Sequence, residues 1–162
     1  MAEILLRTAH LLMFGLMVAG LTGCIILEFH QRSISTTKEI LRIFSLIQKI
    51  HLLVPISGLL LLLTGIVLLK YNFGYDIQHV FGSGWLTAKI ILFAFLLVNG
   101  VIFGTILLNR RTRLLKNETE DNLSQEAIET LSVFRKNIAT YYIVQSFLLI
   151  LIAALSVYGG TQ

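Results

Sequence analysis

The sequence is poor in charged residues, in cysteine and in proline. Of its 162 residues, only 14% are charged and 56% are hydrophobic, and the mean hydropathy is +0.81. A soluble domain carries about a quarter charged residues, so this composition favours a membrane protein. The single cysteine, Cys24, excludes a disulfide within the chain and lies in an apolar run.

Motifs of several common chemistries are also missing. There is no Gly-rich phosphate loop, no zinc-type spacing of Cys and His, no nucleophile triad and no intramembrane carboxylate pair. No basic–aromatic nucleic-acid motif is present either. The formal net charge of +4 is therefore interpreted as a topology signal, with no nucleic acid as partner.

What the sequence does contain is four long apolar stretches. They cover residues 4–29, 50–69, 84–108 and 138–158. Each is close to or above the ~20 residues that a helix needs to cross a bilayer. We therefore predict an all-α, integral membrane four-helix bundle that forms a single domain over residues 1–162. The polar segment at 109–137 is predicted to be a loop outside the hydrocarbon, which would not solvate its charges.

Two amphipathic segments extend these spans. Apolar residues recur at helical spacing from Ile40 to Ile47, so the second helix should begin at the membrane surface and kink near Pro55. In the loop before the fourth span, Ser124 is placed to cap a helix that merges into that span.

The cations are distributed unevenly between the two sides of the predicted bundle. One side has Arg7, Lys70 and Lys89; the other has Arg32, Lys38, Arg42, Lys49, Arg110, Arg111, Arg113, Lys116, Arg135 and Lys136. Cytoplasmic loops are enriched in Lys and Arg. We therefore predict that the first and third loops are cytoplasmic, and that both termini lie on the outer, periplasmic side of a bacterial inner membrane.

The first span contains a short match to a lipoprotein cleavage site, Leu21-Thr22-Gly23-Cys24. Hydrophobicity continues past the cysteine, where a mature lipoprotein turns polar. We therefore expect residues 4–29 to be a true span.

Small residues indicate how the spans pack. The set comprises Ala19, Gly23, Gly58, Gly65, Gly100 and Gly104. Such residues let helix backbones approach closely in lipid. Gly100 and Gly104 fit either a contact within one chain or a homodimer.

Ionisable groups inside spans are costly and are therefore functional candidates. They are His10, His51 and Lys89. The others, predicted to be interfacial, are Glu28, His30, Asp76 and His79. His10 lies about 9 Å and Lys89 about 8 Å below the outer boundary, at ~1.5 Å per residue. His51 is about 27 Å deep, too far from His10 to share one haem.

Paired histidines commonly hold a b-type haem in a four-helix bundle, with cations near the propionates. The candidate metal ligands are therefore His10 and His51, with Arg7 or Lys89 as cation and His79 or a partner subunit as second ligand. Alternatively, Met13 and Met17 beside His10 form a set suited to copper(I). In a third interpretation the histidines only tie helices together in a non-catalytic accessory subunit or assembly factor.

Three short motifs carry a family resemblance. His10 with Ala19-Gly20-Leu21, Pro55 with Thr64-Gly65, and Trp85-Leu86-Thr87-Ala88-Lys89 resemble the first three helices of the HemJ-type membrane protoporphyrinogen oxidases and the related copper-resistance D group. The resemblance implies a bound haem b and catalytic roles for His10 and Lys89. Two positions depart from it. Ile26 and Leu27 stand where the family has an arginine, and Asn99 and Gly100 stand where it has a histidine.

The resulting expectation is an oxidoreductase of the inner membrane. It would hold haem or a porphyrin near the outer face and act in electron transfer or porphyrin oxidation. Within the lipid bilayer, its expected partners are a redox protein or a second copy of the chain.

Overall fold

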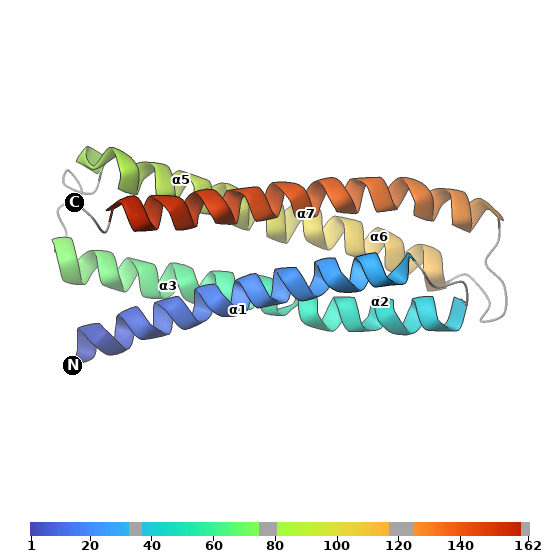
Figure 1. Ribbon diagram of the computed structural model, residues 1–162, viewed down its shortest axis with the longest axis horizontal. Coiled ribbons are helices and arrows are strands. Elements are labelled where there is room, and N and C mark those ends of the chain that lie inside the picture. The colour runs from blue at the N-terminus through green and yellow to red at the C-terminus, as the bar shows by residue number, and fades with distance from the viewer. Residues whose placement is uncertain (33–36, 75–80, 117–124, 160–162) are drawn as a thin grey trace.

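A computed structural model describes residues 1–32, 37–74, 81–116 and 125–159, and all of its named elements are helices (Figure 1). These helices are α1 (Ala2–Gln31), α2 (Thr37–His51), α3 (Leu53–Phe73), α5 (Gly84–Val98), the π-helix η1 (Asn99–Gly104), α6 (Thr105–Lys116) and α7 (Gln125–Gly159). The predicted all-α fold is confirmed.

The helices form a long bundle composed of two pairs. The first helix, α1, packs along α3 and α2, while α5 packs along α7. Figure 1 shows that α1 begins and α7 ends at the same end of the bundle. We call this the terminal end, and the opposite end, where α1 finishes and α7 starts, the distal end.

Four helical segments are long and apolar enough to cross a membrane. They are Ala2–Gln31, Lys38–Asn72, Gly84–Arg111 and Val133–Gly159, and each contains one predicted stretch. At ~1.5 Å per residue, the 35 residues of α7 extend about 52 Å, well beyond a hydrocarbon core of about 30 Å. The bundle therefore projects past the bilayer. The side that faces the cytoplasm stays a prediction.

The second span is interrupted next to its only proline. Pro55 has no N–H to donate to the carbonyl of His51, and α2 ends at His51. Helical hydrogen bonding resumes around the break, from Leu52 N to Gln48 O at 3.3 Å and from Ile56 N to Leu52 O at 3.4 Å. The structure thus shows an interruption at Leu52, close to the predicted kink, while a bend of the helix axis stays a prediction. The apolar face of α2 lies inside the bundle, where Ile47 is buried.

The third connection is more helical than predicted. The prediction of a loop is wrong for residues 109–116, because α6 continues to Lys116. The helix predicted after Ser124 is confirmed, since α7 begins at Gln125 and continues through the fourth span. Helices satisfy their own backbone groups, so they continue beyond the apolar stretch where their side chains find partners. The predicted cap residue, Ser124, lies outside the described residues.

The third span contains a π-helix that the sequence analysis did not predict. Gln145 of α7 donates through Nε2 to the carbonyl of Leu96 at 3.1 Å, and that carbonyl would bind the N–H of Gly100 in an α-helix. Asn99 Nδ2 donates to Gln145 Oε1 at 2.7 Å. The inserted amide therefore occupies a helical acceptor, which explains the wider turn.

The small residues pack helices together, as predicted. A Cβ added at Gly58, one of the predicted positions, would lie 3.0 Å from Leu97. Gly20, which was not among them, makes a similar contact, because a Cβ there would lie 3.3 Å from Val54. A Cβ at Gly100 would lie 2.9 Å from Gln145 Nε2. Gly100 is thus used within the chain, and a homodimer stays a prediction.

Candidate functional site

The most deeply buried charges lie at the distal end, where α1 meets α6. Arg111 donates through Nη1 to Glu28 Oε2 at 2.8 Å and through Nη2 to the Gln31 side-chain oxygen. Arg111 is 1% exposed and Glu28 is 3% exposed. Burying one charge without a partner would cost several kcal/mol, on the order of the desolvation penalty per ion. The pairing of the two opposite charges offsets this penalty.

Further contacts complete the environment of Arg111. Its guanidinium carbon lies 4.8 Å from the ring centroid of Phe44 on α2, a cation–π contact. Arg111 Nε is buried without a hydrogen-bond partner among the described residues. Residues of α1 and α2 therefore contact the guanidinium of α6, and its Nε atom has no hydrogen-bond partner among the described residues.

His51 lies beside this ion pair. Its Nε2 is 3.3 Å from the Tyr141 hydroxyl, and both atoms would lie 2.9 Å from a Cβ built on Gly104. Together with Glu28 and Arg111, these residues line a cavity of about 10 Å³. That volume suits about one water molecule. His51 thus has no room for a porphyrin, and Gly104 is required because a side chain there would strike the imidazole.

Cys24 belongs to the same region. It is fully buried, its sulfur lies 3.8 Å from the carbonyl of Ile47, and it forms a side-chain hydrogen bond with Tyr142. In the structure α1 is continuous through this position. Cys24 therefore behaves as a packed residue inside a true helix.

Sequence reasoning missed this distal cluster, made of Glu28, Gln31, His51, Arg111 and Tyr141. It placed Glu28 at the membrane interface, which stays a prediction, without expecting its side chain to be buried in an ion pair. It counted Arg111 among the loop cations, which is wrong because Arg111 lies in α6. A usable signal was present. The carboxylate ends the first apolar stretch and the arginine follows the third, so both lie at one depth.

The terminal end carries His10, the first residue of the predicted site. His10 Nδ1 lies 2.8 Å from the hydroxyl of Thr64 on α3, whose own Oγ1 donates to Leu60 O at 2.8 Å. The hydroxyl therefore accepts from Nδ1–H, and Nε2 is the unprotonated nitrogen of the neutral ring. A Cβ on Gly65 would lie 3.4 Å from His10 Cε1, so the ring packs against α3 at this glycine.

Lys89 on α5 faces the same region. It is half-buried, and its charge acts electrostatically on His10. Trp85, four residues earlier on the same helix, packs its ring against Gly159 at the end of α7. Lys89 therefore lies within electrostatic range of His10, although α5 and α1 belong to different helix pairs. A shared site for the two residues stays a prediction.

Other predicted site residues are placed differently. Arg7 is exposed and forms an ion pair with Glu3 at 2.6 Å, and its Nη2 donates to Asn72 at 3.4 Å. His79 lies outside the described residues. Arg7 is therefore occupied by protein groups at the surface.

The methionines serve as packing residues. Met17 is buried in the hydrophobic core and Met13 packs against it. No group of three or more His, Cys, Asp or Glu residues is placed to hold a metal within the described part of the chain. The geometry therefore gives the copper interpretation no additional ligand beside His10.

His10 passes a simple test as a ligand for haem iron, and His51 does not. The His10 ring is oriented by a hydrogen bond through one nitrogen, while the other has no protein partner among the described residues. This arrangement is typical of histidines that bind metal. The Nε2 of His51 already faces Tyr141 in a water-sized cavity.

Four apolar spans with charged groups confined to the bundle interior and to the helix ends define a multi-pass integral membrane protein. A family model described as "predicted integral membrane protein (DUF2269)" matches residues 4–158. The chain belongs to this family. No curated protein and no solved structure matches it.

Proposed function

We propose that this protein binds haem or a related porphyrin at the terminal end of the bundle, in a bacterial inner membrane, and acts in electron transfer or porphyrin oxidation. The observation that carries the proposal is the orientation of His10. Thr64 fixes Nδ1 at 2.8 Å, which leaves Nε2 as the coordinating atom. The resemblance of the His10 and Lys89 motifs to the HemJ-type oxidases favours the same site.

Each residue would have a distinct role at this site. His10 Nε2 would bind the iron, with Thr64 holding the ring in one tautomer and raising its basicity. Lys89 would pair with a propionate or another anionic substituent. The bound group would supply one-electron chemistry, while the chain sets its position and surroundings.

A second candidate function rests on a different observation. Both intramembrane histidines make hydrogen bonds to another helix, His10 to Thr64 of α3 and His51 to Tyr141 of α7. Such bonds hold helices together in lipid. On this alternative the protein is a non-catalytic accessory subunit or assembly factor, and the histidines are structural.

The absorbance spectrum of detergent-purified protein separates the two candidates. The haem proposal expects a Soret band, either as isolated or after haem addition, that disappears in His10→Ala. His30→Ala is the matched control, because His30 is an exposed histidine on the same helix. A preparation that stays colourless after haem addition contradicts the proposal and favours the structural alternative. Copper that copurifies and is lost in both His10 and Met13 variants would instead support copper handling.

A further inference from the structure

A basic groove lies at the distal end between the last residue described after α1 and the first part of the fourth span. Arg32, Arg135, Lys136 and Ala139 line this groove, which has a volume of about 350 Å³. No carboxylate is among these lining residues. Among the described residues, none of the three cations forms a salt bridge. Three positive charges therefore converge on a space bordered by one small side chain.

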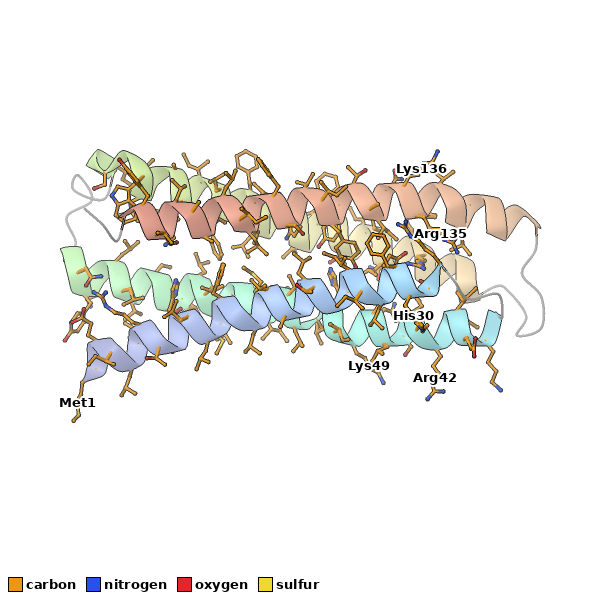
Figure 2. All side chains as sticks on the ribbon, viewed as in Figure 1. Met1, His30, Arg42, Lys49, Arg135 and Lys136 are labelled. Carbon is orange, nitrogen blue, oxygen red and sulfur yellow. The ribbon has the colours of Figure 1, made fainter. Side chains whose placement is uncertain are left out.

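The groove is positioned at a membrane boundary. The first apolar stretch, residues 4–29, ends three residues before Arg32, and the fourth, residues 138–158, begins two residues after Lys136. Figure 2 labels Arg135 and Lys136 on α7 at the same end of the bundle as Arg42 and Lys49 of α2. The three cations therefore lie at the depth of the lipid headgroups, whichever side of the membrane this end faces.

An apolar surface leads from the groove toward the middle of the bilayer. Ala139 is followed along α7 by Ile143, Phe147 and Ile150, all exposed and at the three- and four-residue spacing of one helix face. On α1, the Arg32 guanidinium carbon lies 4.6 Å from the ring centroid of Phe29, which is also exposed. A molecule in the groove can therefore place a charged head among the cations and an acyl chain along this face.

We propose that this groove binds the headgroup of an anionic phospholipid. Phosphate oxygens accept hydrogen bonds from guanidinium and ammonium groups. Basic pockets at helix ends are suited to acidic lipid headgroups, and each cation contributes attraction that falls off within a Debye length. The apolar face below the groove favours a lipid over free phosphate, because free phosphate would use only the charged part.

Native mass spectrometry of the detergent-purified protein tests the proposal. Phosphatidylglycerol and phosphatidylcholine with identical acyl chains are titrated separately, and the bound lipid is counted. The test variant is Arg135→Gln/Lys136→Gln. The control is Arg42→Gln/Lys49→Gln, which removes the same charge from exposed positions at the same end. We expect phosphatidylglycerol affinity to fall roughly tenfold or more in the test variant, at roughly fivefold per cation, and little in the control.

Three outcomes would overturn the proposal. Equal losses in the two double variants would mean that the attraction is spread over the whole end of the bundle. Equal binding of the two lipids by the unmodified protein would mean that the headgroup charge is not recognised. Displacement of bound phosphatidylglycerol by excess inorganic phosphate, at constant ionic strength, would show that the groove takes soluble phosphate. Retained lipid preference after phosphate addition supports the proposal. All four substituted cations are at least partly exposed, so the variants should fold.

Discussion

The two ends of this bundle are held together in different ways. At the distal end, polar side chains connect the two helix pairs, since Glu28 of α1 binds Arg111 of α6 and His51 of α2 meets Tyr141 of α7. At the terminal end, the hydrogen bond of His10 stays within one pair, with Thr64 of α3. Lipid gives helices no hydrophobic reason to associate. Buried polar contacts therefore connect the two pairs at the distal end, while at the terminal end His10 Nε2 has no protein partner among the described residues.

The largest effect should come from breaking the distal ion pair. Arg111→Met leaves the Glu28 carboxylate buried without its partner and should reduce stability by about 3–5 kcal/mol. The buried thiol of Cys24 is the only cysteine, so its reaction with a fluorescent maleimide during heating reports unfolding directly. Glu28→Met/Arg111→Met should recover much of the loss, because it removes both charges.

Arg110→Met is the control for this substitution, since Arg110 is the exposed neighbour on the same helix. Equal thermal shifts for Arg110→Met and Arg111→Met would show that the ion pair does not fix the distal end.

A smaller loss of stability is expected from adding a methyl group at Gly104. A Cβ at Gly104 would lie 2.9 Å from His51 Nε2 and from the Tyr141 hydroxyl, so Gly104→Ala should cost about 1–3 kcal/mol through overpacking. Gly15→Ala is the control, because nothing lies within 4 Å of a Cβ there. The same thiol assay compares them, and a neutral Gly104→Ala would mean that the distal helices can move apart at little cost.

Removing the hydrogen bond of His10 at the terminal end should change stability less than it changes ligand affinity. Thr64→Val removes the partner of His10 Nδ1 and should cost about 1 kcal/mol. If His10 binds haem, the same change should weaken haem affinity roughly tenfold, since the hydrogen bond orients the ligand. Thr140→Val is matched, because the Thr140 hydroxyl is exposed and bonds only its own helix at Lys136 O. Unchanged haem affinity in Thr64→Val would argue against His10 as an oriented ligand.

The smallest effect is expected at the surface of the terminal end. Arg7 and Glu3 form an ion pair at 2.6 Å with side chains 58% and 40% exposed, and such pairs contribute about 0–1 kcal/mol. Arg7→Gln should therefore change the unfolding temperature little and less than Thr64→Val. A larger shift would indicate that Arg7 has a role beyond its exposed contacts, as a cofactor-binding cation would.

Composition and periodicity were enough to predict the membrane fold. Four apolar stretches of sufficient length have few alternatives in a bilayer, and the proline and glycine positions predicted the interruption of the second span and the close helix contacts. The depth argument also placed His10 and Lys89 near one level, because helical rise converts residue number into distance. Their role as ligands stays a prediction.

The distal cluster needed three-dimensional information. Depth alone does not say which way a side chain faces, and Arg111 lay among many cations that all fitted a cytoplasmic loop. The decisive feature was the wide turn at residues 99–104, which depends on Gln145, a residue 46 positions from its partner Asn99. Local sequence patterns do not reveal a contact between residues so far apart in the chain. The third span was therefore predicted as a regular helix.

That wide turn has a consequence for every residue behind it. A π-helical turn is equivalent to one additional residue in an α-helix, and one residue corresponds to about 100° of rotation. The extra residue therefore changes the angular phase of α6 relative to α5, and this phase directs Arg111 toward Glu28. Deleting a single residue between Asn99 and Gly104 would restore a regular helix and turn the guanidinium away from its carboxylate. Both charges would remain in the chain, but they would no longer face each other.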